Sequence, residues 1–92
     1  MKCFFINITE KAQLDLKKLQ KYEPKAYKKA LKLIAELYEH PTTGTGHPEP
    51  LKGFPANRWS RRINEKHRLV YRILKEEVIV LVLSSYGHYD DK

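Results

Sequence analysis

Residues 58–72 read RWSRRINEKHRLVYR, and this stretch decides how the rest of the chain can fold. It holds all five arginines of the protein, whereas twelve of the thirteen lysines lie outside it. Apolar and polar side chains alternate on both sides of Asn64-Glu65-Lys66, which has the composition of a tight turn. The pattern therefore predicts a β-hairpin with strands at Arg58–Ile63 and His67–Leu74.

The two faces of the second predicted strand differ in chemistry. Leu69, Tyr71 and Ile73 point to one face, because side chains alternate along a strand, and we expect that face to be buried. Arg68 and Arg72 point to the other face. Arginine presents a planar fork of donors that matches phosphate oxygens two at a time. We therefore expect the arginine face to bind an anion, and a nucleic-acid backbone is the anion that we favour.

Composition limits the classes of protein to which the chain can belong. Its 92 residues suit a single domain, in which we expect residues 90–92 to be a flexible tail. The formal charge of +7 favours acidic partners such as nucleic acid. No apolar run approaches the about 20 residues of a transmembrane helix, and the N-terminal apolar run is shorter than the about 7–15 residues of a signal peptide. A cytoplasmic protein without membrane contact is expected.

The remaining segments predict an α+β fold in the order strand, helix, helix and three further strands. Lys2–Ile8 has the composition of a strand, and Thr9 is a plausible N-cap for a helix that ends near Lys21. Pro24 favours the first turn of a second helix. Val78–Leu83 has the pattern of a strand buried on both faces. Short turns join the last three strands, so we expect an antiparallel meander with both helices on one face of the sheet.

The sequence predicts a buried and a solvated surface on the two helices. Four apolar residues of the second helix recur at i, i+4, i+7 and i+11, which predicts a buried stripe of Tyr27, Leu31, Ile34 and Tyr38. Eight lysines lie between Lys11 and Lys32. We expect them to form solvated outer faces, and contact of some of them with RNA phosphates is the alternative.

Glu49 stands between two prolines in the segment that precedes the hairpin. Pro48 fixes its own φ, and Pro50 pushes Glu49 towards an extended conformation, so the carboxylate is held on a stiff backbone. A rigid surface loop is one interpretation of this segment. A positioned acid–base group is the other.

A carboxylate, an imidazole and several arginines are the parts needed to cut RNA without a metal. The ribose 2′-OH attacks the adjacent phosphorus, which requires a base, an acid for the departing 5′ oxygen and cations around the phosphate. Glu49, Arg62, Arg68 and the terminal His88-Tyr89 would supply them if they met on one face of the sheet. No cofactor or metal is expected. The lone Cys3 and the scattered histidines do not form a ligand set.

Four separated blocks of this sequence resemble the YoeB/Txe toxins of the RelE/ParE superfamily, which belong to type II toxin–antitoxin systems. They are GHPEPLK (46–52), WSRRI (59–63), HRLVY (67–71) and the closing HY (88–89). The resemblance implies a RelE-like fold of the microbial-ribonuclease type. It also implies cleavage of mRNA in the A site of the 70S ribosome and neutralisation by a YefM-like antitoxin whose C-terminal segment wraps the toxin. A homodimer is plausible by the same analogy.

The resemblance also implies catalytic roles for residues of these blocks. Glu49 matches the position of the general base and His88 that of the general acid. Arg68 matches the phosphate-stabilising arginine. Tyr89 falls on a supporting position that binds phosphate or stacks on a base.

Further residues of the same blocks are expected to bind substrate. Lys52 and Arg62 fall on the family's supporting positions, and we add their neighbours Arg61 and His67 as phosphate contacts. For His67 a structural role is the alternative.

Two other classes of function remain open. A DNA-gyrase-poisoning toxin of the ParE branch would use the same fold without acid–base residues, and Glu49 and His88 argue against it. A non-enzymatic basic module that binds RNA or an acidic protein would explain the arginines. It would leave Pro48-Glu49-Pro50 and the terminal His-Tyr pair unexplained.

Overall fold

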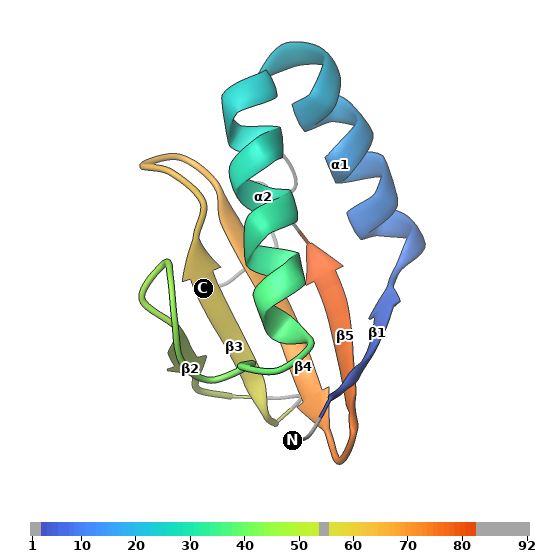
Figure 1. Cartoon of the computed structure of the whole chain (residues 1–92), viewed down its shortest axis with the longest axis vertical. Coiled ribbons are helices and arrows are strands. Elements are labelled where there is room, and N and C mark those ends of the chain that lie inside the picture. The colour runs from blue at the N-terminus through green and yellow to red at the C-terminus, as the bar shows by residue number, and fades with distance from the viewer. Residues whose placement is uncertain (1–2, 54–55, 83–92) are drawn as a thin grey trace.

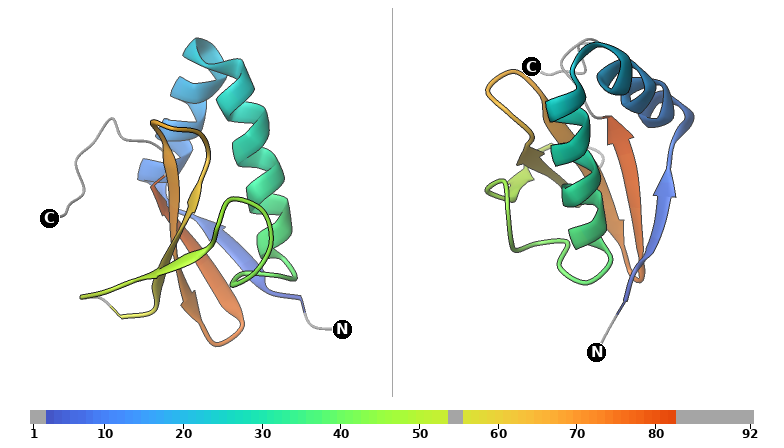
Figure 2. Two further views of the ribbon diagram at one scale, coloured as in Figure 1. Left: turned by 90° about the vertical axis from the view of Figure 1, so that its left-hand side faces the viewer. Right: turned by 45° about the horizontal axis from the view of Figure 1, so that its top comes forward.

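Two helices lie on one face of a five-stranded sheet in the computed structural model, which describes residues 3–53 and 56–82 (Figures 1 and 2). The elements are β1 (Phe5–Ile8), α1 (Glu10–Tyr22), α2 (Pro24–Leu37), β2 (Glu49–Leu51), β3 (Arg58–Arg62), β4 (Arg68–Leu74) and β5 (Glu77–Val82). The strand order in the sheet is β1-β5-β4-β3-β2. β1 pairs with β5 in parallel, and the other neighbours are antiparallel. The predicted α+β fold, with its meander and its two helices on one face, is confirmed.

One strand was not predicted. The segment around Glu49, interpreted above as a stiff loop, forms β2 and pairs with β3. Pro50 has no backbone N–H to donate, and proline is tolerated in a sheet at an edge, where one side needs no partner. β2 is such an edge strand. The two prolines therefore stiffen a short strand rather than a loop.

The ends of both helices follow the predicted signals. The Thr9 hydroxyl accepts a hydrogen bond from the N–H of Ala12 at 3.2 Å, and α1 begins at the next residue. Pro24 occupies the first turn of α2. Only Glu23 separates the two helices, so they form a tight antiparallel pair above the sheet (Figure 1).

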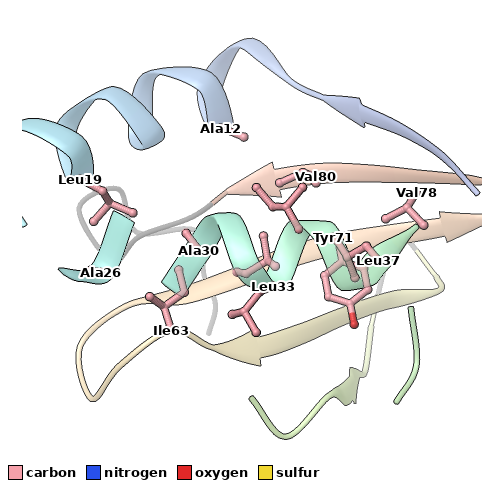
Figure 3. Close-up of a cluster of buried hydrophobic side chains, with 12 residues drawn as sticks. Ala12, Leu19, Ala26, Ala30, Leu33, Leu37, Ile63, Tyr71, Val78 and Val80 are labelled. Carbon is pink, nitrogen blue, oxygen red and sulfur yellow. The ribbon is translucent and has the colours of Figure 1, made fainter. Parts of the chain in front are cut away.

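The buried stripe of α2 differs from the predicted one. The fully or nearly fully buried residues are Ala26, Ala30, Leu33, Ile34 and Leu37. Leu31 and Tyr38, which were predicted to be buried, are 43% and 49% exposed. The predicted stripe has the right helical spacing but begins one residue too late in the chain, at Tyr27 instead of Ala26. Alanine is small and gives a weak apolar signal in the sequence. Ala26 and Ala30 nevertheless belong to the buried cluster (Figure 3).

The core lies between the helices and the sheet. Leu69 and Tyr71 of β4 are fully buried there, as the alternation along the hairpin predicted, and Ile73 is partly buried against this core. Val78 and Val80 of β5 are fully buried beside Tyr71 (Figure 3). Val70 points to the opposite face, yet it is also buried. The arginine face of the hairpin is therefore exposed at Arg62 and Arg68 and not along its whole length.

Candidate active site

Strand register places two of the five arginines side by side on the face away from the helices. Arg62 at the end of β3 pairs with Arg68 at the start of β4. Directly paired residues of antiparallel strands point to the same face, about 4.5–5.5 Å apart at Cβ. Both arginines are exposed. The β3–β4 hairpin thus presents two guanidinium groups to solvent at one end of the sheet.

β2 brings Glu49 to the same face. Glu49 pairs with Ser60, which precedes Arg62 by two residues and therefore shares its face. These side chains line a pocket of about 360 Å³, here called the Glu49 cleft, whose lining residues are His47, Glu49, Arg62 and Arg68. A carboxylate and two guanidinium groups thus lie around one small cleft.

A backbone contact fixes the chain where it enters β2. The N–H of Arg62 donates to the carbonyl of Gly46 at 2.7 Å. Gly46 has a φ of +87°, and a Cβ at this position would lie 2.9 Å from the Arg62 carbonyl oxygen. Only glycine avoids both the strained φ and the collision. Gly46 therefore sets the distance between the Glu49 segment and the arginine hairpin.

The three charged side chains of the Glu49 cleft have no partner in the described part of the chain. No hydrogen bond or ion pair of the Glu49, Arg62 or Arg68 side chain is found among residues 3–53 and 56–82. The arginines at the other end of the same face differ. Arg58 donates to the Lys52 carbonyl at 3.1 Å, and Arg72 donates to the Ala56 carbonyl at 3.0 Å.

Arg61 is inside the protein, and the prediction that it binds substrate is corrected. Its side chain is 0% exposed and points towards α2, because it alternates with Arg62 along β3. The guanidinium binds five groups of the protein, which are the carboxylate of Glu36, the hydroxyl of Tyr71 and the carbonyls of His40, Thr43 and Thr45. Arg61 thus holds the loop between α2 and β2.

This network perturbs two titratable groups. Burial raises the pKa of Glu36, but hydrogen bonds from Thr45 and Arg61 and the charge of Arg61 outweigh burial, so the pKa lies below its ordinary value. Burial raises the pKa of Tyr71 despite the opposing effect of Arg61. The Tyr71 hydroxyl therefore stays protonated and donates to the Pro41 carbonyl.

His67 is also inside the protein, so its predicted contact with phosphate is corrected in favour of the structural alternative. The ring is 0% exposed, and its Nε2 lies 2.8 Å from Oε2 of Glu23. Lys66 Nζ lies 3.3 Å from the same oxygen. Glu23 joins α1 to α2, so this contact fastens the β3–β4 turn to the junction of the helices.

The other predicted site residues fall outside the cleft or outside the described residues. Lys52 follows β2, is exposed and does not line the Glu49 cleft. His88 and Tyr89 lie outside the described residues, so their roles stay predictions. Within residues 3–53 and 56–82, no group of three or more His, Cys, Asp or Glu side chains could hold a metal ion. No helix in the same part of the chain is long and apolar enough to cross a membrane.

His47 is a cleft residue that the sequence reasoning missed. It lines the Glu49 cleft and has a φ of +52°, which is rare for a residue other than glycine. No spacing rule predicted it, because the φ of +52° breaks the extended conformation in which residues two apart share a face.

Known proteins match both the sequence and the fold. The model of a family described as "YoeB-like toxin of bacterial type II toxin-antitoxin system" matches residues 8–89. The toxin YoeB of Synechocystis sp. is 39% identical over 84 residues, which are 91% of this chain and 95% of that protein.

Solved structures agree with this match. A YoeB/ParE toxin from Agrobacterium tumefaciens is 33% identical with a TM-score of 0.80, covering 94% of this chain and all of that one. YoeB of Staphylococcus aureus is 31% identical, solved as a dimer and as a complex with YefM. Their TM-scores are 0.79 and 0.77, with 94% of this chain and 98% of that chain covered. The chain therefore belongs to the YoeB-like toxins of bacterial type II toxin–antitoxin systems.

Proposed function

We propose that this toxin is a ribosome-dependent endoribonuclease that cuts mRNA in the ribosomal A site without a metal. The O2′ of a ribose attacks the adjacent phosphorus, and the bond from phosphorus to the 5′ oxygen of the next nucleotide breaks. One proton leaves the 2′-OH, and one is delivered to the departing 5′ oxygen. The products are a 2′,3′-cyclic phosphate and a free 5′-OH.

The observation that supports this proposal is the set of charges without partners in the Glu49 cleft. The guanidinium groups of the neighbouring Arg58, Arg61 and Arg72 all bind acceptors of the protein, which are backbone carbonyls for Arg58 and Arg72 and include the Glu36 carboxylate for Arg61. Arg62 and Arg68 stand directly opposite each other and keep their donors free within the described chain. Two guanidinium groups held together in this way suit a phosphate that gains charge in the transition state.

Each group of the cleft has a distinct role in the proposed reaction. Glu49 takes the proton of the 2′-OH, and its position on a strand edge leaves room for a ribose beside it. Arg68 and Arg62 bind the non-bridging phosphate oxygens. The resemblance assigns the protonation of the leaving oxygen to His88, with Tyr89 in support.

The ribosome has a physical part in this proposal. The Glu49 cleft is small and lies on an exposed face, so the toxin alone gives an RNA strand few contacts. A ribosome that holds the message can align the 2′-OH with the phosphorus and convert a rare encounter into a positioned one, an effect that can contribute about 7–11 kcal/mol in favourable cases. We expect slow cleavage of naked RNA and much faster cleavage of ribosome-bound message. The site of action would be the cytoplasm, where ribosomes work.

A YefM-like antitoxin and a second toxin copy are the proposed protein partners. The S. aureus structures named above contain YoeB with YefM and YoeB as a dimer. We propose that acidic residues of the antitoxin approach Arg62 and Arg68, because those guanidinium groups are free. Binding should weaken as salt is added, since rim charges steer association. Antitoxin and RNA should also compete, and simultaneous binding without mutual loss would refute a shared site.

Cleavage of message on programmed ribosomes tests the proposed function. Arg68→Ala should lower the rate by about 10²–10³-fold, which corresponds to about 2.7–4 kcal/mol in the barrier. Glu49→Gln keeps the shape of the side chain but cannot accept the proton, so it should also be slow. Lys28→Ala, an exposed lysine on α2, is the matched control and should cut like wild type. Near wild-type cleavage by the Arg68→Ala protein would end the assignment.

A further inference from the structure

A second groove adjoins the Glu49 cleft and is not used by the chemistry proposed above. It has a volume of about 410 Å³ and lies between α2, the segment before β2 and the β3–β4 turn. His47 and Arg62 line both hollows, so the two lie side by side. Lys29 lines the far side of this second hollow, here called the Lys29 groove.

Lys29 is an unpaired, partly buried cation. It is the one lysine of α2 that is not exposed, and no acidic partner is found for it in the described part of the chain. Other lysines do pair, since Lys11 contacts Asp15 at 2.7 Å and Lys66 contacts Glu23 at 3.3 Å. An anion bound in the groove would meet this ammonium without competition from a counter-charge in the described part of the chain.

The β3–β4 turn adds a donor and an acceptor at the edge of the Lys29 groove. The Oδ1 of Asn64 accepts hydrogen bonds from the N–H groups of Lys66 at 2.9 Å and His67 at 2.7 Å. These contacts fix the amide and leave its NH₂ group as a donor. The next residue, Glu65, also lines the groove, and its carboxylate has no partner in the described part of the chain.

His47, which lines both hollows, has an uncommon backbone conformation. His47 has a φ of +52° and follows Gly46, whose carbonyl accepts from the N–H of Arg62. A non-glycine residue in this region is strained and persists where the surroundings enforce it, which is frequent at binding sites. The side chain that separates the Glu49 cleft from the Lys29 groove is therefore positioned by the backbone.

We propose that the Lys29 groove binds the nucleotide next to the scissile phosphate. Lys29 contacts the phosphate of that nucleotide, and Asn64 and Glu65 contact its base. A nucleotide fits better than an acidic peptide, because the Glu65 carboxylate repels a second carboxylate but accepts from the amino group of a base. The inference rests on the proposed function, since it extends the path of the same RNA strand.

Binding of short uncleavable RNA analogues tests the groove. Oligonucleotides with 2′-O-methyl riboses cannot be cut, because the attacking oxygen is blocked. A dinucleotide carries only the phosphate of the Glu49 cleft, whereas a pentanucleotide also carries the phosphate that Lys29 would contact. Titration of the isotopically labelled toxin, followed by NMR, measures even weak affinities. The variants are Lys29→Ala, Lys29→Arg as the charge-preserving variant and Lys28→Ala as the matched control.

The expected results differ between the ligands. Lys29→Ala should weaken binding of the pentanucleotide several-fold and leave the dinucleotide unchanged. It should also lower the slope of log K against log salt by about 0.7, which is the loss of one phosphate contact on a single strand. Lys29→Arg should restore both, and Lys28→Ala should behave like wild type.

Three results would overturn the assignment. Equal losses for Lys29→Ala and Lys28→Ala would indicate general attraction by the helix surface. No saturable binding of the pentanucleotide, or an unchanged affinity in Lys29→Ala, would remove the subsite. A loss of affinity for an acidic antitoxin peptide but not for the pentanucleotide would make the groove a protein-binding surface. The wild-type ribosome assay separates these failures from failure of the proposed function, because message cleavage by wild type does not depend on the Lys29 result.

Discussion

Arg61 and Arg62 are neighbours in the sequence with opposite expected roles, and alanine substitutions separate those roles. Arg61→Ala removes the guanidinium that binds Glu36, Tyr71 and three loop carbonyls. The Tyr71 hydroxyl that remains is buried and the other four acceptors are part-buried, so they are not all satisfied after the substitution. We expect the variant to be strongly destabilised.

The expected loss of unfolding free energy in Arg61→Ala follows from the burial of the Arg61–Glu36 ion pair. Removal of one member of a buried ion pair costs about 3–5 kcal/mol. The Glu36 side chain is 24% exposed and can recover some hydration, so the lower end of about 3 kcal/mol is expected. For a domain of 60–100 residues, 1 kcal/mol corresponds to about 4–8 °C in Tm. Arg61→Ala should therefore lower Tm by about 12–24 °C.

Arg62→Ala is the matched control for stability. Its side chain is exposed and has no partner in the described chain, so its free energy of unfolding should stay within about 0.5 kcal/mol of wild type. Its cleavage of ribosome-bound message should fall, because one of the two phosphate-binding forks is lost. The pair of variants thus separates stability from activity at adjacent positions.

Urea unfolding followed by circular dichroism measures both variants. The midpoint should fall for Arg61→Ala and stay unchanged for Arg62→Ala, with similar m-values in all three proteins. Equal midpoints for the two variants would refute the internal role of Arg61. A cleavage rate for Arg62→Ala equal to that of wild type would refute the role of Arg62 in the cleft.

Three further predictions concern the network, the loop and the cleft. Ionised Glu36 stabilises the fold above its unfolded pKa of about 4.5, and this contribution is lost as pH falls through its lower folded pKa. The difference in unfolding free energy between wild type and Glu36→Gln should therefore shrink in acid, and urea titrations between pH 7 and pH 3 measure it. Gly46→Ala should destabilise by about 1–3 kcal/mol through its φ of +87° and slow cleavage by displacing β2, whereas an unchanged midpoint would remove the steric reasoning. Arg68→Lys should stay impaired on programmed ribosomes, because one ammonium cannot replace a two-donor fork; full activity would show that charge alone suffices.

The hairpin shows how much of the fold the sequence could predict. Its alternation placed Leu69 and Tyr71 in the core and Arg68 outside, and the register confirms that arrangement. The same alternation, applied to β3, would have sent Arg61 inward. Its charge led to the opposite prediction. The five acceptors of its guanidinium come from segments that are distant in the sequence, so spacing along β3 does not reveal them.

His67 was misplaced for the same reason, whereas β2 and the buried stripe of α2 were missed for local reasons. The partner of His67 is Glu23, which is 44 positions away, so no local pattern announces the contact. The short strand at Glu49 was hidden by prolines, which are depleted in strands but tolerated at an edge. The alanines that bury α2 resemble neutral helix formers in the sequence. Glu49, Arg62 and Arg68 were named together because family-like blocks contain all three, but their meeting in one cleft depends on β2, which was not predicted.

The chemistry of the cut ends tests the central proposal most directly. Wild-type toxin and programmed ribosomes should yield an upstream fragment that ends in a 2′,3′-cyclic phosphate and a downstream fragment with a 5′-OH. A message with a 2′-deoxy nucleotide at the cleavage position should resist cutting, since the nucleophile is missing. A 5′-phosphate on the downstream fragment, or unchanged cutting of the 2′-deoxy message, would contradict attack by the 2′-OH in the Glu49 cleft.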